Sequence, residues 1–342
     1  MKVSILITSY NYQQFVARTI ESALSQTYPD VEVIVVDDGS KDGSVEVIGR
    51  FGARIKALFK PNGGQASAFN AGWRMATGDI VFLLDSDDVL RPDAVERVVD
   101  AWRPSYSKLH FRLAVTDAKL RPLGATLPRS PLPEGNLSRQ VLDQGLYISP
   151  PTSGNVFSRN FLDQVMPIPE REWRYGAETY PVFLAPLYGE IGAINDTLCF
   201  YRTHGNNFTA MSRRIEPGKL VSLLQIDLNL RRTLEHFAAR LGLALSPEAS
   251  TSHWLHYKIR LACCKLGGAI HPFPEDRVMP LAGQLIRAAY RAPELSPAMR
   301  AIFTAWALAV ACLPKPASEP LIRLAFSPSQ RPPLMRALLH RG

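Results

Sequence analysis

Short apolar runs and amphipathic segments alternate along the first 90 residues of the chain. The apolar runs are rich in β-branched residues, as is typical of buried strands, and they lie at 3–8, 31–36, 55–59 and 80–84. Between them, apolar residues recur at helical spacing, which predicts helices over 13–26, 44–50 and 65–77. This alternation predicts an α/β fold in which helices cover both faces of a mostly parallel sheet.

The pattern changes twice farther along the chain. Four prolines between 121 and 135 predict an irregular surface loop there. Beyond residue 215, apolar residues again recur at helical spacing, which predicts helices over 219–241, 251–266, 277–291 and 297–313. We therefore expect one domain over 1–215 and a helical C-terminal region over 216–342.

The two parts of the chain differ in net charge. The hydrophobic content of 46% and the charged content of 20% are those of an ordinary globular protein. Residues 1–215 carry 23 basic and 23 acidic side chains, whereas 216–342 carry 16 and 8, so the whole net charge of +8 belongs to the helical region. This excess favours an anionic surface or an acidic partner, although a solvated helical face has the same composition.

Cysteine spacing and apolar runs indicate the compartment. The cysteines have no C-x-x-C spacing, so neither a zinc site nor a disulfide framework is indicated. The start of the chain lacks the apolar segment of a signal peptide, and the longest apolar run, 301–313, is 13 residues long. Crossing a bilayer takes roughly 20 apolar residues. We therefore expect a cytoplasmic protein.

An acidic cluster follows the apolar run 80–84: Asp85, Ser86, Asp87 and Asp88. Carboxylates this close repel one another, which raises their pKa values unless a positive charge lies between them. Mg²⁺ and Mn²⁺ prefer oxygen ligands and commonly bridge such carboxylates to phosphates. A strand-end turn is the alternative, because Asp and Ser also favour turns.

Two other predicted strands end in polar residues, at 8–11 and 37–40. Ligands of open parallel sheets bind at the carboxyl ends of the strands, so we expect the three polar strand ends to gather at one edge. We expect no compensating lysine or arginine near their five carboxylates, which favours a metal or a hydrogen-bond-donating ligand. No G-x-G-x-x-G follows the first strand and no G-x-x-x-x-G-K-[ST] occurs, which argues against dinucleotide dehydrogenases and P-loop enzymes.

A series of motifs occurs in order along the chain: SILITSYN (4–11), SQTY (25–28), VVDDGS (35–40), NGGQ (62–65), FNAG (69–72), GDIVFLLDSDD (78–88), PTSGNVFSR (151–159) and YRTHGNN (201–207). This series resembles family 2 glycosyltransferases. The resemblance implies a GT-A fold, with a nucleotide-sugar-binding half over 1–100 and an acceptor half over 101–215. It also implies metal-dependent, inverting transfer of a sugar, as in hexosyltransferases, from a nucleotide-diphosphate donor, expected to be a UDP-sugar.

The resemblance implies, residue by residue, which side chains bind the nucleotide-sugar donor and the metal. The expected nucleotide-sugar contacts are Thr8, Tyr10, Asp37, Asp38, Asn62, Gln65, Asn70, Asp85 and Ser86. A carboxylate of 37–38 would accept the imide N–H of uracil, although Asp37 also suits a turn. The expected ligands of Mg²⁺ or Mn²⁺ are Asp85, Asp87, Asp88 and His204, and a structural hydrogen bond is the alternative for His204.

An inverting displacement also needs a base to take the proton of the acceptor hydroxyl. The resemblance places it at Glu178, where relatives usually carry Asp, and a helix-capping role is the alternative. Glu190 and Asp196 are weaker candidates. His253 and His256 could share a metal on a helix, but no third ligand is evident.

The expected partners are a nucleotide-sugar donor and a glycan or lipid-linked acceptor, and no nucleic acid. The Q-x-x-R-W element of processive synthases is absent, so we expect a non-processive enzyme of bacterial envelope or exopolysaccharide synthesis. The basic region 216–342 would dock on anionic lipid at the inner face of the plasma membrane, or instead contact the catalytic domain or a second subunit. A catalytically inactive nucleotide-binding relative and a sugar-phosphate nucleotidyltransferase are the alternative functions.

Overall fold

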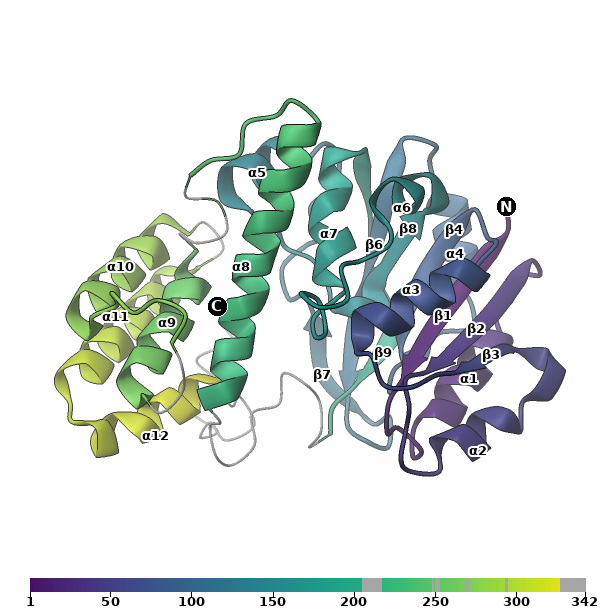
Figure 1. Ribbon diagram of the computed structural model, residues 1–342, viewed down its shortest axis with the longest axis horizontal. Coiled ribbons are helices and arrows are strands. Elements are labelled where there is room, and N and C mark those ends of the chain that lie inside the picture. Colours follow the sequence, from purple (N-terminus) through teal and green to yellow (C-terminus); the bar gives the residue numbers. More distant parts are fainter. Residues whose placement is uncertain (205–216, 248, 250–252, 268–270, 293–294, 327–342) are drawn as a thin grey trace. The chain divides into compact units, whose positions relative to one another are not determined.

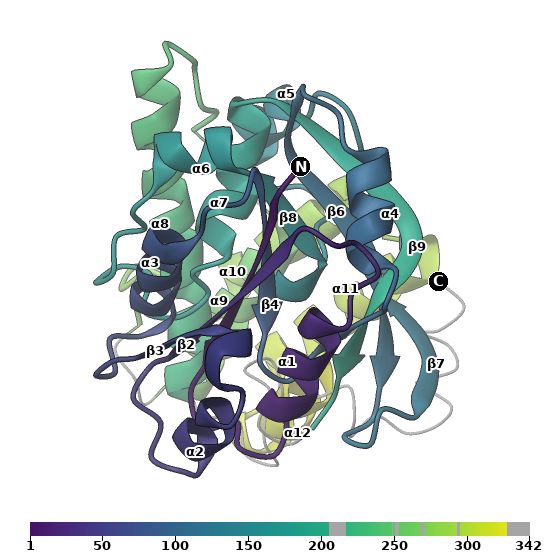
Figure 2. The ribbon, with the colours of Figure 1, turned by 90° about the vertical axis from the view of Figure 1, so that its right-hand side faces the viewer.

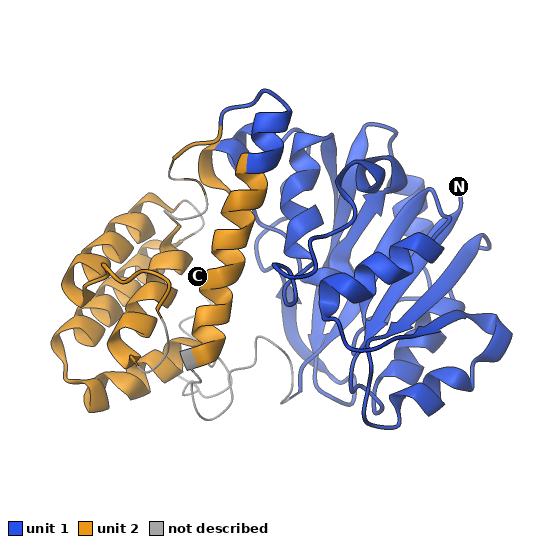
Figure 3. Cartoon of the chain, in the orientation of Figure 1, with its two compact units in different colours: residues 1–142, 146–204, 236–244 blue, residues 143–145, 205–235, 245–342 orange. Residues whose placement is uncertain are grey.

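The computed structural model describes residues 1–204, 217–247, 249, 253–267, 271–292 and 295–326 (Figure 1). The end of the YRTHGNN segment (205–207), the start of the helix expected at 251 and the expected domain boundary at 215–216 lie outside the described residues. The chain forms two compact units (Figure 3). The first comprises Met1–Leu142, Leu146–His204 and His236–Ala244, and the second comprises Asp143–Gly145, Gly205–Glu235 and Leu245–Gly342.

Nine strands of the described residues form one sheet, in the order β3-β2-β1-β4-β8-β6-β9-β5, with β7 on β6. The strands are β1 Val3–Ser9, β2 Val31–Asp37, β3 Lys56–Phe59, β4 Ile80–Asp85, β5 Val89–Leu90, β6 Tyr106–Thr116, β7 Pro122–Leu127, β8 Asn155–Ser158 and β9 Glu190–Arg202. Strands β1 to β4 are mutually parallel, whereas β8 runs antiparallel to β4 and β6. The predicted mostly parallel sheet is therefore confirmed.

Helices cover both faces of this sheet because the side chains of each strand alternate between two apolar cores. Ile5 of β1 shares one core with Val16, whereas the neighbouring Leu6 faces Phe69 on the other side. Helices α1 (Val16–Leu24) and α4 (Ala94–Ala101) cover one face, and α3 (Gln65–Met75), α6 (Arg159–Val165) and α7 (Thr179–Leu184) cover the other (Figure 2). The first unit also contains α2 (Ser44–Gly49) and most of α5 (Ser138–Gln144).

The prediction of an irregular loop over 121–135 is partly wrong. Residues Pro122–Leu127 form β7, which pairs with β6 alone. Proline lacks a backbone donor, yet it is tolerated as the first residue of an edge strand, which is the position of Pro122. The proline pattern therefore marked the ends of a strand as well as a loop.

The second unit is helical, as the sequence predicts. Its elements are most of α8 (Pro217–Arg240), together with α9 (Trp254–Leu266), α10 (Val278–Arg291), α11 (Pro297–Cys312) and α12 (Lys315–Phe326). Leu261, Leu285 and Val310 meet in its apolar core. Helix α12 was not predicted, and it contains Pro320, a residue that usually breaks or kinks a helix. None of the described helices has the length and apolarity needed to cross a membrane.

Candidate active site

Three neighbouring parallel strands end at the same edge of the sheet. Ser9 at the end of β1 pairs with Asp37 at the end of β2, and Thr8 pairs with Asp85 at the end of β4. Ligands of open parallel sheets bind outside this edge. The strand ends that were expected to gather are therefore adjacent.

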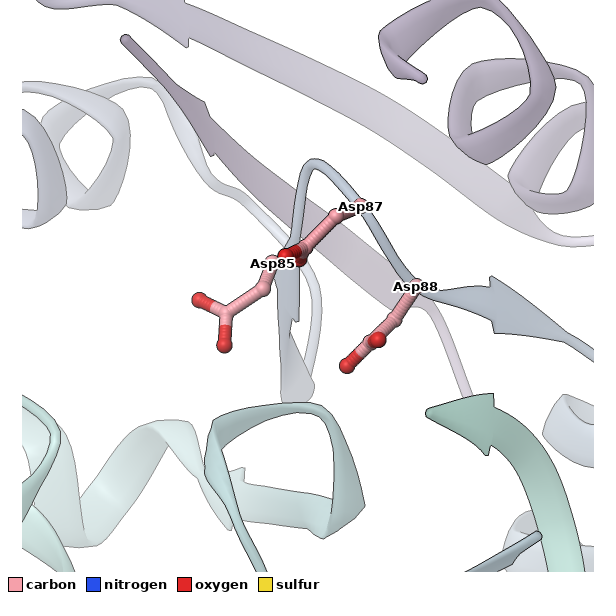
Figure 4. Close-up of side chains that lie close together, drawn as sticks. All are labelled: Asp85, Asp87 and Asp88. Carbon is pink, nitrogen blue, oxygen red and sulfur yellow. The ribbon is translucent and has the colours of Figure 1, made fainter. Parts of the chain in front are cut away.

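Asp85, Asp87 and Asp88 each offer a carboxylate oxygen, and these atoms lie within 4.8 Å of one another (Figure 4). The N–H of Asp88 donates to the carbonyl of Asp85 at 3.1 Å, which closes the turn after β4. Thr19 Oγ1 lies 2.9 Å from the carbonyl oxygen of Ser86 and 2.7 Å from that of Asp88, so α1 fixes the turn. In the part of the chain that the structure describes, this is the one cluster of three or more side chains placed to hold a metal ion.

Burial and mutual repulsion act on the same carboxyls. Burial raises the pKa of Asp85 well above its ordinary value, and the charges of Asp87 and Glu178 raise it further. Burial likewise raises the pKa of Asp88, with Asp87 and Asp85 adding to it. Asp88 Oδ2 is buried and has no hydrogen-bond partner among the described residues. A divalent cation would relieve the repulsion and supply that partner, so these hard oxygen donors fit Mg²⁺ or Mn²⁺.

His204 reaches the cluster from just beyond β9. Its Nε2 lies 2.9 Å from Asp87 Oδ2, and both side chains are buried. The imidazole stacks on Phe15 at 4.7 Å between ring centroids, and the guanidinium of Arg202 lies 4.8 Å from the same ring. The N–H of Arg202 donates to Asp88 Oδ1 at 2.9 Å. His204 thus makes the structural hydrogen bond that was the alternative to a ligand role, and it is not one of the three side chains whose ligand atoms gather within 4.8 Å.

Asp37 and Asp38 organise the turn after β2. Asp37 Oδ1 accepts a 2.8 Å hydrogen bond from the N–H of Ser40. Asp38 accepts from Lys60 Nζ at 2.6 Å and from the N–H groups of residues 63 and 64 at 2.9 and 2.7 Å. The expectation that no lysine or arginine compensates the strand-end carboxylates is therefore wrong for Asp38. The reason is that β3 pairs with β2, which brings Lys60 beside it.

The turn before α3 contacts the segment before α7. Asn62 Oδ1 accepts from the Arg174 guanidinium at 2.5 Å, and the N–H of Gln65 donates to the Arg174 carbonyl at 3.0 Å. Gln65 Oε1 accepts from the N–H of Ala177 at 3.0 Å. Gly64 has a φ of +91°, and a Cβ there would lie 2.5 Å from Arg174 Cγ, so the close approach requires glycine.

Glu178 lies at the start of α7 and is half-buried. Burial raises the pKa of its carboxyl, and a hydrogen bond from the Gln65 side chain opposes that rise. Glu178 Oε2 is buried and has no hydrogen-bond partner among the described residues. The side chain makes no capping hydrogen bond to α7, so the helix-capping alternative gains no support. Its charge also acts on Asp85, so both carboxyls belong to one electrostatic environment.

The remaining residues expected to contact the nucleotide sugar lie in different surroundings. Tyr10 is 42% exposed beyond the end of β1. Ser86 is buried within the acidic turn. Asn70 is buried. Its Nδ2 donates to the carbonyl of Ile168 and its Oδ1 accepts from the N–H of Ile168, each at 2.8 Å, so Asn70 links α3 to a segment far away in the sequence.

The two weaker base candidates lie apart from the acidic cluster. Glu190 begins β9, at the end of the strand opposite Arg202, and accepts a 2.8 Å hydrogen bond from Ser105. Asp196 pairs with Arg97 of α4 at 2.6 Å. Neither geometry favours a base role over that of Glu178.

The two histidines at the start of α9 have separate partners. His253 Nδ1 accepts from the N–H of Leu255 at 3.2 Å and caps the helix. His256 Nδ1 lies 2.8 Å from Asp227 Oδ2. Neither histidine belongs to a group of three potential metal ligands among the described residues, so the geometry does not favour that idea.

Sequence reasoning missed several partners of the site. Lys60 contacts Asp38, Phe15 stacks on His204, and the N–H of Arg202 donates to Asp88. These contacts arise from strand pairing and loop packing, which local sequence patterns do not encode. The side chain of Thr152 hydrogen-bonds Asp85, and this contact opposes the rise in the pKa of that carboxyl, which burial causes. The one available signal was the PTSGNVFSR segment, which contains residue 152.

Residues 4–109, which include the acidic cluster, match the family described as glycosyl transferase family 2. An uncharacterized glycosyltransferase of Nostoc sp., alr2836, is 36% identical over 250 residues, which are 71% of this chain and 77% of that protein. The chain belongs to glycosyltransferase family 2.

Solved structures show the fold of this glycosyltransferase. S. aureus TarS in complex with UDP aligns with a TM-score of 0.56 at 15% identity, over 95% of this chain and 91% of that one. The mannosyltransferase PcManGT from Pyrobaculum calidifontis, in complex with GDP-Man and Mn²⁺, aligns with a TM-score of 0.52 at 18% identity, over 95% and 85%. This family 2 glycosyltransferase therefore has the GT-A fold.

Proposed function

We propose that this glycosyltransferase moves a sugar from a UDP-sugar to an acceptor hydroxyl with inversion at the anomeric carbon. The observation that carries the proposal is the placement of Glu178, whose buried Oε2 lacks a partner among the described residues and whose charge acts on Asp85 of the acidic cluster. An inverting transfer needs these two features together, a site for the leaving diphosphate and a base near it. The TarS complex with UDP supports the choice of nucleotide.

Asp85, Asp87 and Asp88, together with His204, would hold the cation. A bound Mg²⁺ or Mn²⁺ would neutralise the charge that develops on the diphosphate. Burial raises the pKa of Asp85 and Asp88 in the absence of the cation, so a bound cation would favour the ionised form of these two carboxyls.

Glu178 would act as the base. Its Oε2 would accept the hydroxyl proton of the acceptor as the acceptor oxygen bonds to the anomeric carbon and the bond to the diphosphate oxygen breaks. The raised pKa of the Glu178 carboxyl, which burial causes, strengthens the carboxylate as a proton acceptor. Gln65 would keep that carboxylate in position.

The nucleoside would lie over the ends of β1 and β2. Thr8 and Tyr10 would line one side. Asp37 would accept the imide N–H of uracil, since it accepts two hydrogen bonds from Ser40 whereas Asp38 accepts three. Asp38 would act indirectly, by holding Lys60 and the turn of residues 63–64.

The proposal can be tested by measuring the binding and slow hydrolysis of a panel of UDP- and GDP-sugars with and without Mn²⁺. We expect Mn²⁺-dependent binding of at least one UDP-sugar and hydrolysis that is lost in EDTA. Binding of no UDP-sugar under either condition would reject the donor class, and binding without hydrolysis or transfer would favour an inactive relative.

The acceptor would be a glycan or a lipid-linked sugar of envelope or exopolysaccharide synthesis, reached from the inner face of the plasma membrane. The helical unit offers exposed apolar side chains on α10, Met279 (60%) and Tyr290 (56%), and the same helix carries the exposed Arg287 and Arg291. Such a mixture suits a surface of anionic phospholipid.

Sedimentation with phosphatidylglycerol vesicles tests this docking, and pure phosphatidylcholine vesicles are the control. We expect binding to anionic vesicles that weakens at high salt and falls further in an Arg287→Glu, Arg291→Glu variant. Equal recovery in the supernatant with both vesicle types at low salt would reject the membrane contact.

A further inference from the structure

Lys108 of β6 is a lysine buried without a carboxylate partner. Its relative exposure is 0%, and no carboxylate among the described residues acts on its charge. Its Nζ lies 2.9 Å from Tyr147 Oη, 2.9 Å from Ser149 Oγ and 3.2 Å from His110 Nδ1. Burying an amine without a counter-ion costs free energy, so its hydrogen bonds must offset that cost.

All three neighbours of the amine accept hydrogen bonds. Tyr147 Oη donates its own proton to the Val182 carbonyl at 2.8 Å, and Ser149 Oγ donates to Asn155 Oδ1 at 3.1 Å. His110 Nε2 lies 2.8 Å from the carbonyl of Pro133, so we assign the ring proton to Nε2 and leave Nδ1 as an acceptor. Lys108 therefore donates to three groups at once, which takes the three N–H bonds of the ammonium form and opposes the lowering of its pKa that burial causes.

One arm of this network leads to the segment beside Asp85. Ser149 holds the Asn155 amide, whose Nδ2 lies 2.9 Å from the carbonyl oxygen of Pro151 and 3.2 Å from that of Thr152. The side chain of Thr152 hydrogen-bonds the Asp85 carboxyl. The arm thus connects Lys108 to a direct neighbour of the acidic cluster.

The other arm leads to the helix that follows Glu178. Tyr147 bonds the carbonyl of Val182 in α7 and contacts Phe183 edge-on, with ring centroids 5.4 Å apart. Residue 178 directly precedes α7, and the N–H of Val182 donates to the Glu178 carbonyl at 3.1 Å. The two arms meet at Lys108, and all their members belong to the first unit.

We infer that Lys108 is a positioning residue that fixes the distance between the Asp85 and Glu178 carboxyls. The inference rests on the proposed function, because the distance matters only if one carboxyl serves the leaving group and the other the acceptor. Misplacing reacting groups by about 1 Å costs up to 10²-fold in rate.

Three substitutions test the inference in the full chain. Tyr147→Phe and Ser149→Ala each remove one arm, and Lys108→Met removes the shared donor while keeping most of the side-chain volume. We expect kcat to fall roughly 10-fold for each arm and up to about 100-fold for Lys108→Met, with less than a threefold change in donor KM. Leu109→Ala is the matched control, since Leu109 is fully buried on the same strand but belongs to the apolar core.

The control separates positioning from stability. Leu109→Ala should lower the melting temperature at least as much as the two arm variants and leave kcat within threefold of wild type. Equal losses of kcat in Leu109→Ala and Tyr147→Phe would overturn the inference, as would unchanged kcat in Lys108→Met.

A crystal structure of Tyr147→Phe or Lys108→Met gives a second readout that does not depend on activity. We expect the Asp85 and Glu178 carboxyls to move relative to each other by about 1 Å. Coincident positions in wild type and both variants would overturn the inference even if the wild-type protein transferred no sugar. A wild-type protein without transfer, in contrast, would count against the proposed function.

Discussion

Gln65 Oε1 accepts a 3.0 Å hydrogen bond from the backbone N–H of Ala177, 112 residues away in the sequence. The bond ties the start of α3 to the segment that leads into α7. The same Gln65 side chain also hydrogen-bonds the carboxyl of Glu178, which opposes the rise in pKa that burial causes there. The turn that carries the expected donor contacts Asn62 and Gln65 is therefore part of the support for the base.

Replacing Gln65 by Leu removes the amide contacts to both Ala177 and Glu178. We expect kcat to fall about 10- to 100-fold, because the base loses its orientation. The acid limb of the kcat profile should also move to higher pH, since an uncompensated buried carboxylate has a higher pKa. Steady-state kinetics over a range of pH measure both effects. Gln164→Leu, on the exposed side of α6, is the control and should behave as wild type.

The substitution Glu178→Gln distinguishes a role of Glu178 as the base from a role in binding the sugar donor. The amide cannot accept the hydroxyl proton, so we expect transfer to fall by 10²- to 10⁴-fold while UDP-sugar affinity stays within threefold. In the wild-type protein, burial raises the pKa of Glu178, so the ionised base forms and the rate rises as pH increases through that raised pKa.

Glu190→Gln is the control for the base, since Glu190 lies at the far end of β9. It should keep wild-type rates. Retained transfer in Glu178→Gln together with loss in Glu190→Gln would move the base to β9. Loss of donor binding in Glu178→Gln would instead make Glu178 a part of the donor site.

Sequence periodicity predicted the parallel half of the sheet because each strand there is a continuous apolar run. It did not predict β8, β6 and β9, which include polar residues such as Asn155 and Lys108 inside the strands. Those residues form buried hydrogen-bond networks, which depend on partners far away in sequence and leave no local pattern.

The acidic edge of the site was predictable for a related reason. Strands that run parallel must end at the same edge, so polar residues after each apolar run are brought together by topology alone. The compensation of Asp38 by Lys60 and the contact of Gln65 with Glu178 were not predictable, because they follow from the packing of loops between elements.

Asp88→Asn tests the metal site through stability as well as affinity. We expect at least 10-fold weaker Mn²⁺ binding by calorimetry in the presence of UDP, since one oxygen donor loses its charge. Without metal, the variant should instead be more stable than wild type at neutral pH, because one of three repelling carboxylates is removed.

The sign of the pH dependence follows from the raised pKa values of Asp85 and Asp88, which burial causes. A carboxyl whose pKa is raised on folding gives the metal-free protein its full stability below the unfolded value, about 3.9, and loses it as pH rises through the folded value. The melting-temperature gap between Asp88→Asn and wild type should therefore widen from pH 5 to pH 8 and close on adding Mn²⁺. Asp79→Asn, an exposed residue before β4, should show neither effect.

Glu32 offers a test of stability alone, because it lies at the amino edge of β2, opposite the acidic cluster. Burial alone would raise its pKa, but hydrogen bonds from Lys56, Ser4 and Thr77 lower the pKa to about 2. A carboxyl with a lowered pKa stabilises the fold above its unfolded value, about 4.3, and this stabilisation is lost as pH falls toward the folded value. Glu32→Gln should therefore cost about 1–2 kcal/mol at pH 7 and little at pH 2.5.

Urea unfolding of Glu32→Gln and wild type at pH 7 and near pH 2.5 measures the two differences in the free energy of unfolding. The exposed Glu46 supplies the control, and Glu46→Gln should change stability by less than about 0.5 kcal/mol at either pH. The kcat of Glu32→Gln should equal that of wild type, because the network around residue 32 does not reach the ends of the strands. A loss of stability that stays the same at both pH values would show that the carboxylate charge is not what these hydrogen bonds stabilise.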